Sequence, residues 1–449
     1  MTACWPVRKT QTYIPRSLCK TIFFSFLISY NISMHRYTRR SMIWLSMTNG
    51  LLLFGYGLSL PFFTIYLISQ KGLSAAMAGL IIGLSALSRS VASALAGELS
   101  DVLGRKCVMQ WGIALEVAAM FGLALCIEYQ AQTGWLLLCY LLTTFLGAVF
   151  RPASNAWITD HTSSKQRVEA FGIIRIGLNT GWALGPAVGG FLVRYSYSLA
   201  FYLTALAYCF TVLCLQVIIP EDSLKAKKRA RRPHMAALFT ALQDSRLAKI
   251  CFYVFLITAV NAQLVVGLSV HCNQYLGMPE YYIGWFFTIN GLATVLLQYP
   301  ASRWISRFRL STGMLVGCAL YAVGFGSVGF FASFIPIACG VFLSAAGELI
   351  VSPGEQTLAS NIASAPTRGR YLGLVMVFYN MGSSAGFFIA GWLGQYVAPH
   401  YLPGPWLIVG AVALLAGVGF WRLRYSLTDQ QDGKFNVPVP VKKDTVTLH

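Results

Sequence analysis

Long apolar runs separated by short charged turns restrict what this chain can fold into more than any other feature of its sequence. Hydrophobic residues make up 56% of the 449 residues and charged residues only 11%, whereas a soluble chain carries about a quarter charged residues. A run of about 20 apolar residues is long enough to cross a bilayer as a helix, which satisfies its own backbone hydrogen bonds there. The sequence therefore predicts an all-α integral membrane protein.

Twelve apolar segments are expected to cross the membrane, and a charged run divides them into two sets of six. The charged run extends from Pro220 to Pro233 and cannot lie in lipid. The predicted organisation is a basic tail (1–41), a first bundle (42–219), a linker (220–247), a second bundle (248–424) and a polar tail (425–449). The predicted spans are 43–69, 73–99, 106–127, 133–159, 166–192, 197–219, 248–275, 280–304, 309–333, 335–361, 368–396 and 404–423.

The basic residues predict which side each loop faces. If both tails and the linker lie on one side of the membrane, all but five of the 34 lysines and arginines fall on that side. Two of the five, Lys71 and Arg194, lie on the opposite side, and the other three lie within spans: Arg89, Arg151 and Arg175. Since basic loops stay in the cytoplasm, both termini are expected there, in the plasma (inner) membrane. The net charge of +19 is expected to face anionic lipids, because nucleic-acid binding needs a basic face on a soluble surface.

Two further features concern the N-terminal tail and the cysteines. The apolar patch 21–28 is too short to span, so the tail is expected to be interfacial or disordered, with Met34 or Met42 as alternative start sites. Most of the eleven cysteines lie in apolar runs with no Cys-x-x-Cys pair. We interpret them as small buried hydrophobic residues, and we expect no disulfide framework, metal site or cofactor.

An internal repeat relates the two halves of the chain. Residues 152–192 align without gaps onto residues 353–393, and eight positions agree, including Pro152 with Pro353 and Asn179 with Asn380. Shared proline and asparagine positions do not follow from glycine content alone. The repeat predicts two pseudo-symmetric six-helix bundles related by an axis along the membrane normal.

The turn between the second and third spans carries a recognisable motif. Its sequence, Gly97-Glu-Leu-Ser-Asp101-Val-Leu-Gly104-Arg105-Lys106, resembles the loop that the major facilitator superfamily of secondary transporters has at this place. Gly104 permits a tight turn, and Arg105 and Lys106 hold the loop in the cytoplasm. The resemblance implies a twelve-helix, two-bundle fold. It also implies a conformational gate, in which Arg105 pairs with Asp160 and Asp101 lies near Thr367.

The fifth span carries a second motif, formed by Gly181, Gly185, Pro186, Gly189 and Gly190. It is similar to the signature of the drug:proton antiporters within that superfamily. Small residues let a neighbouring helix approach closely, and Pro186 removes a backbone hydrogen bond, so the helix can bend. Generic helix packing would produce a similar pattern. Together the two motifs favour export.

Charged residues inside the spans indicate where transport chemistry should lie, because burying an ionisable group in lipid is costly. Glu355, Glu348 and Glu116 are the proton-coupling candidates, and we expect Glu355 to carry the proton, assisted by Glu348 and tuned by Arg151. Each of these carboxylates could instead be a static packing partner. The expected substrate cavity is lined by Arg151, Asn49, Tyr56, Asn261 and Gln263. We expect His271, near the end of its span, to be structural.

Two departures weaken the proton assignment. The first span has no acidic residue, and Thr143 stands where the antiporters usually have an arginine. Coupling to sodium and facilitated transport therefore stay open.

The hypothesis from sequence is a monomeric, proton-coupled secondary exporter of amphipathic drugs or metabolites. The alternative is an importer or facilitator of a small polar solute such as a sugar, peptide or organic anion. An enzyme is not expected, because the sequence contains neither a catalytic constellation nor a nucleotide-binding loop. The substrate itself is not determined by the sequence.

Overall fold

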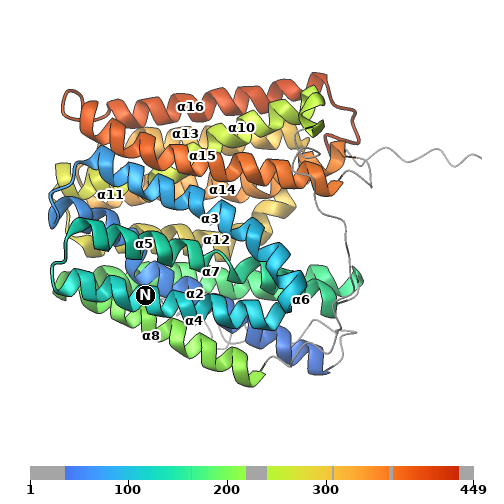
Figure 1. Cartoon of the computed structure of the whole chain (residues 1–449). Coiled ribbons are helices and arrows are strands. Elements are labelled where there is room, and N and C mark those ends of the chain that lie inside the picture. Colours follow the sequence, from blue (N-terminus) through green and yellow to red (C-terminus); the bar gives the residue numbers. More distant parts are fainter. Residues whose placement is uncertain (1–35, 163, 219–239, 306–307, 364–367, 434–449) are drawn as a thin grey trace, which may run out of the picture.

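The computed structural model describes residues 36–162, 164–218, 240–305, 308–363 and 368–433, and these residues form an all-helical protein. Its helices run along one common direction (Figure 1). Two of the predicted regions, the N-terminal tail up to residue 35 and the linker at 219–239, lie outside the described residues. The helices of the first half of the chain are α2 (Arg36–Ser69), α3 (Ala75–Leu103), α4 (Arg105–Glu128), α5 (Thr133–Gly147), α6 (Phe150–His161), α7 (Ser164–Tyr195) and α8 (Tyr197–Ile218).

The second half contains long helices together with short irregular segments. It comprises η1 (Thr240–Gln243), α10 (Ser245–Asn261), η2 (Ala262–Leu264), α11 (Gly267–Val270), the π-helical turn η3 (His271–Tyr275), α12 (Glu280–Ile305), α13 (Leu310–Val328), α14 (Phe334–Ile362), α15 (Arg368–Tyr396), α16 (Gly404–Arg422) and η4 (Leu423–Tyr425). Eleven helical segments among the described residues are long and apolar enough to cross a membrane. The helix α12, which matches the predicted segment 280–304, is not among these eleven.

The predicted span 133–159 is not one continuous helix, because it breaks at Ala148 and Val149 between α5 and α6. Pro152 has no backbone N–H and so cannot bond to the Ala148 carbonyl one turn earlier. The hydroxyl of Ser93 on α3 donates to that carbonyl instead, at 3.3 Å. Arg151 therefore lies directly after a helix break.

The predicted span 248–275 is also irregular. The long helix α10 ends at Asn261, and a single turn of tighter helix follows at η2. One further α-helical turn, α11, then leads into the π-helical turn η3. The amide of Gln263 donates to the carbonyls of Ala259 and of Gly386 on α15, both at 3.2 Å. These bonds supply partners for backbone groups at the irregular point.

The buried apolar side chains form two clusters. One draws mainly on residues 42–215, with Phe63, Tyr140 and Trp157 among its large members. The other draws mainly on residues 247–423, with Phe286, Phe325 and Phe420. Each half of the chain therefore has a core of its own.

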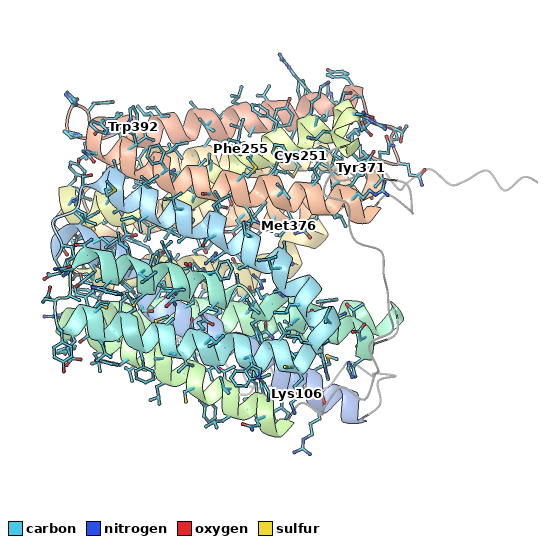
Figure 2. All side chains as sticks on the ribbon, viewed as in Figure 1. Lys106, Cys251, Phe255, Tyr371, Met376 and Trp392 are labelled. Atoms are coloured by element: carbon cyan, nitrogen blue, oxygen red, sulfur yellow. The ribbon has the colours of Figure 1, made fainter. Side chains whose placement is uncertain are left out.

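The two halves meet along two helix pairs, α3 with α15 and α7 with α12. We call the end of the molecule that carries the Gly104 turn the turn end, and the opposite end, with residues 70–74 and 129–132, the hairpin end. In Figure 2, Tyr371 and Trp392 mark where α15 lies at the turn end and the hairpin end, respectively. Backbone contacts of α3 with α15 join Gly79 to Phe387 and Gly83 to Ser384, toward the hairpin end.

The segment after α16 folds back onto the turn end of the second half. Asp432 is fully buried, and its carboxylate accepts hydrogen bonds from the backbone N–H (2.8 Å) and hydroxyl (2.7 Å) of Ser311, in the first turn of α13. The carbonyl of Gln431 accepts from the Asn361 amide at 3.1 Å. Residues 426–433, predicted as part of a polar tail, thus connect the ends of α13 and α14.

Candidate functional site: a polar cluster between the two halves

Arg89 on α3 is the centre of the polar contacts in the first half. Its guanidinium donates to the hydroxyl of Tyr56 on α2 at 3.1 Å and lies 5.5 Å from the centre of that ring. Trp182 on α7 lies next to the same ring, with centroids 6.2 Å apart, and meets Phe287 of α12 edge-on at 5.7 Å. A row of contacting aromatic rings thus leads from Arg89 in the first half to α12 in the second half.

Glu348 and Glu355 lie two turns apart on α14 and supply two carboxyl groups from the second half. Glu348 accepts a hydrogen bond from the Asn290 amide of α12 at 3.3 Å, and it also contacts Asn261 and lies within electrostatic range of Arg175. Glu355 is only 3% exposed and lies within electrostatic range of Glu348. Among the described residues, no hydrogen bond to the Glu355 carboxyl is observed.

Tyr379 on α15 interacts with ionisable groups from both halves. It is within electrostatic range of Arg89 and Arg151 from the first half and of Glu348 and Glu355 from the second. We call Arg89, Arg151, Tyr379, Glu348 and Glu355 the central cluster. Within the described structure no ion pair joins Arg151 to either glutamate, whereas Tyr379 interacts electrostatically with Arg151 and with both glutamates.

The other predicted residues are distributed over several places. Asn49 is buried between α2 and α6, where its amide donates to the Leu45 carbonyl (2.8 Å) and the Ser154 hydroxyl (3.3 Å). Glu116 is buried inside the first half, with its carboxyl against Gly147 and within range of Arg89. Tyr56 and Asn261 contact members of the central cluster.

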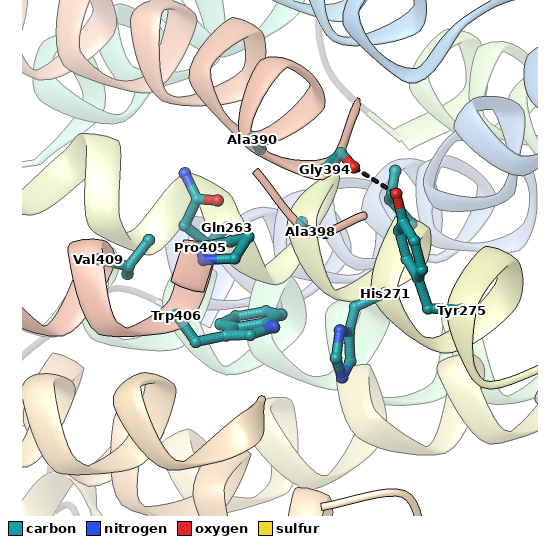
Figure 3. A pocket seen from close by; sticks show the side chains of 11 residues that line it. Gln263, His271, Tyr275, Ala390, Gly394, Ala398, Pro405, Trp406 and Val409 are labelled. Atoms are coloured by element: carbon teal, nitrogen blue, oxygen red, sulfur yellow. Dashed lines mark hydrogen bonds between the residues drawn. The ribbon is translucent and has the colours of Figure 1, made fainter. Parts of the chain in front are cut away.

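Gln263 lines a pocket away from the central cluster, with His271, Tyr275 and Trp406 (Figure 3). The Tyr275 hydroxyl donates to the Gly394 carbonyl at 2.5 Å, and the His271 ring meets the Trp406 ring edge-on at 5.4 Å. The pocket has a volume of about 20 Å³, which is room for about one water molecule. It is too small for an organic substrate, so Gln263 does not line a substrate-sized space here.

A larger groove of about 530 Å³ lies along α2, α7 and α8. Its lining is almost entirely apolar, including Phe54, Leu206 and Phe210, and it contains none of the predicted site residues.

The gate motif forms a compact set of contacts at the turn end. Gly104 has φ +95°, a conformation that favours glycine. The Arg105 guanidinium lies 3.2 Å from the Asp160 carboxylate and donates to the Ser100 hydroxyl at 2.7 Å. Lys106 extends away from the bundle (Figure 2), and its ammonium group lies 3.4 Å from the Gln216 carbonyl. The side chain of Asp101 and residues 364–367 lie outside the described residues, so the expected contact near Thr367 is not seen, and Gly97 has open space around it.

The glycine motif of α7 packs against two helices at once. Gly181, Gly185 and Gly189 lie directly on the backbone of α2, while Pro186 and Gly190 lie on Gly284 and Tyr281 of α12. A side chain at Gly181, Gly185 or Gly189 would collide with backbone atoms of α2, and one at Gly190 would be tightly placed against the backbone of α12. The motif therefore holds α7 against its own half on one face and against the other half on the opposite face.

Sequence reasoning had singled out Arg89 and Arg175 only as intramembrane charges, and it missed Tyr379 and Asn290. Tyrosine and asparagine are common in apolar helices, so their spacing alone carried no signal. Arg175 reaches across to α12, where it donates to the Gln298 side chain at 3.4 Å.

Comparison with known proteins identifies the family to which this chain belongs. The sequence profile of the Major Facilitator Superfamily matches residues 45–279 and 250–446. The chain belongs to the major facilitator superfamily. Within it, multidrug resistance protein MdtH of Aeromonas salmonicida (strain A449) is 25% identical over 377 residues, covering 82% of this chain and 92% of that protein. MdtH of Yersinia enterocolitica is 23% identical over 385 residues, covering 84% and 93%.

Solved structures of other transporters share the fold. The nucleoside transporter NupG superposes with a TM-score of 0.73 at 14% identity, covering 86% of this chain and all of that one. The peptide transporter POT in complex with sulfate gives 0.70 at 16% identity, covering 88% and 96%. This member of the superfamily is thus a membrane transporter that resembles the multidrug branch in sequence.

Proposed function

We propose that this transporter is a proton-coupled exporter of amphipathic compounds that works by alternating access. The observation that supports this best is the central cluster, in which arginines of one half and carboxylates of the other lie around Tyr379. Buried charges in a membrane protein are costly unless they take part in a pathway. The similarity to proteins named for multidrug resistance favours export of amphipathic compounds.

The architecture we propose for it has twelve spans in two six-helix bundles, with α12 as the eighth span. The two separate apolar cores and the contacts of α12 with α7 and α14 support this arrangement. The distribution of basic residues supports cytoplasmic termini in the inner membrane, facing anionic lipids, and we propose that the transporter acts as a monomer. The turn end is then cytoplasmic, and the described contacts of α3 with α15 close the outer, hairpin end.

The proton step of this proposal uses Glu355. When the cluster is open to the cytoplasm, Glu355 loses its proton, and the carboxylates near Tyr379 attract a cationic amphipathic compound such as ethidium, with Arg151 and Arg89 tuning the strength of that attraction. When the cluster is open to an acidic outside, Glu355 takes up a proton, its negative charge is lost, and the substrate is released there. Tyr379, in range of all four charges, transmits this change between the halves.

Glu355→Gln tests the proton step. The variant is expected to lose efflux driven by a pH gradient while keeping substrate binding that depends less on pH. Efflux of ethidium from an efflux-deficient host, and ethidium binding to purified protein, provide the two readouts. Glu128→Gln, at the hairpin end of α4 and bonded to Tyr202, is the matched control and should transport normally. If Glu355→Gln keeps its normal pH dependence, the proton is carried elsewhere, with Glu116 the next residue to test.

The alternative is an importer or facilitator of a small polar solute, which the fold similarity to nucleoside and peptide transporters favours. Cells that express the transporter would then accumulate a labelled solute of one of these classes instead of losing ethidium.

A further inference from the structure

We propose that Cys126 and Cys139 form a reversible disulfide between α4 and α5, which makes the hairpin end of the first half a redox modification site. The two Sγ atoms lie 4.0 Å apart. No other pair of sulfurs is in contact among the nine cysteines that the structure describes.

The α4–α5 hairpin holds the two thiols in place. Cys126 lies in the last turn of α4, and Cys139 lies in the second turn of α5, on the helix packed beside it. The connection has four residues, and the Ala131 N–H donates back to the Cys126 carbonyl at 2.9 Å. The Lys71 ammonium donates to the Ala131 carbonyl at 2.8 Å. A connection tied down in this way keeps the two sulfurs together without further loss of chain entropy.

The geometry is suited to a disulfide. A disulfide has an S–S distance of about 2.05 Å, so each sulfur needs to move by about 1 Å, which side-chain rotation provides. Both cysteines are only half-buried. Cys126 is three residues from the exposed Tyr129, or about 4.5 Å along a helix, so it lies close to the end of its span and to the adjacent aqueous phase.

A buried hydroxyl without a partner lies beside this pair. Tyr66 on α2 is 1% exposed and lies within electrostatic range of Cys126, and its hydroxyl has no hydrogen-bond partner in the part of the chain that the structure describes. A buried donor without an acceptor is costly. A thiolate at Cys126 would provide that acceptor at the moment when the thiol must ionise to react.

The chemistry is thiol–disulfide exchange with an external disulfide. The Cys126 thiolate attacks one sulfur of the reagent, forming a mixed disulfide and releasing the first thiolate. The Cys139 thiolate then attacks the Cys126 sulfur and releases the second thiolate. The two protons lost by the cysteines pass to the two leaving thiolates, so the reagent is reduced to two thiols as the cysteine pair is oxidised by two electrons.

The experiment uses the full chain in membrane vesicles, treated with oxidised glutathione, then alkylated, digested and analysed by mass spectrometry. We expect a disulfide-linked pair of peptides containing Cys126 and Cys139 that disappears on reduction. Cys126→Ser should leave Cys139 fully alkylated or glutathionylated, and Cys139→Ser should trap Cys126 as the mixed disulfide. Cys209→Ser, which removes an exposed thiol, is the matched control and should leave the linked pair unchanged.

Two results would overturn the proposal. One is full alkylation of both thiols after oxidation. The other is a linked pair that forms only in denatured protein, and there at the same rate in Tyr66→Phe as in the unsubstituted protein. The link would then not come from the folded hairpin.

Discussion

The contact between α3 and α15 gives the sharpest test of the conformational cycle, because it rests on glycines. An ideal Cβ at Gly79 would lie 2.6 Å from the Phe387 carbonyl oxygen, and one at Gly83 would lie 2.7 Å from that of Ser384. A carbon and a carbonyl oxygen normally approach to about 3.3–3.6 Å. Each alanine therefore demands a shift of about 0.7 Å, and the opposing atoms are backbone and cannot rotate away.

The clash exists only while the hairpin end is closed. Overpacking of this kind costs about 1–3 kcal/mol, and it raises the free energy of the closed state alone. A difference of about 1–3 kcal/mol between two states shifts their ratio by about 5- to 150-fold. Gly79→Ala should therefore move the population toward a state open at the hairpin end by about this factor, and Gly79→Ala with Gly83→Ala should move it further.

The measurement is the distance between spin labels on Met77→Cys of α3 and Tyr396→Cys of α15, in a background with the reactive native cysteines removed. Both positions are exposed near the hairpin end. We expect a longer-distance population to grow in Gly79→Ala. Gly134→Ala is the matched control, because nothing lies within 4 Å of a Cβ there. An unchanged distance distribution in Gly79→Ala would show that the α3–α15 contact does not close this end.

Three further predictions concern the turn end. Arg105→Ala removes the contact with Asp160, and an ion pair as exposed as this one contributes at most about 1 kcal/mol to stability. The variant should nevertheless raise cysteine labelling from the cytoplasm. Arg309→Ala, which removes the exposed pair with Asp429, is the control, and equal labelling in the two variants would refute the gate. Asp432→Ala leaves the first turn of α13 without its cap, at a cost of about 0.5–2 kcal/mol, and should accelerate hydrogen exchange at the Ser311 amide; unchanged exchange would contradict the capping role. Burial raises the pKa of Asp244, but hydrogen bonds from Arg246 and Tyr371 outweigh burial and hold that pKa below its usual value. Its stabilising contribution is therefore present above pH about 3.9 and lost as the pH falls through the folded-state pKa. Asp244→Asn should lower the melting temperature at pH 7, and the difference should shrink as the pH falls below about 3.9, whereas a constant difference at all acidic pH values would contradict the assignment.

Much of the fold could be predicted because the bilayer imposes it. Apolar length, the basic turns and the repeat predicted a helical membrane protein, and eleven candidate spans in the described residues match predicted segments. The helix breaks at Ala148 and after Asn261 were not predicted. They depend on partners from other helices, Ser93 and the Gly386 carbonyl, and hydropathy does not report such partners.

The candidate site, like the fold, could be predicted from the sequence only in part. Residue type and span position alone show that Arg89, Arg151, Glu348 and Glu355 are ionisable groups inside apolar helices, where each carries a free-energy penalty. Which of them lie close together follows from the packing of the helices.

The tertiary structure brought Tyr379 within electrostatic range of arginines and glutamates that are about 200 or more residues apart in the sequence. It also placed Gln263 in a one-water pocket and brought the sulfurs of Cys126 and Cys139 into contact. A helix has 3.6 residues per turn, so sequence gives the face on which a residue lies. Which helix meets that face is set by packing between distant segments, and that information is not local.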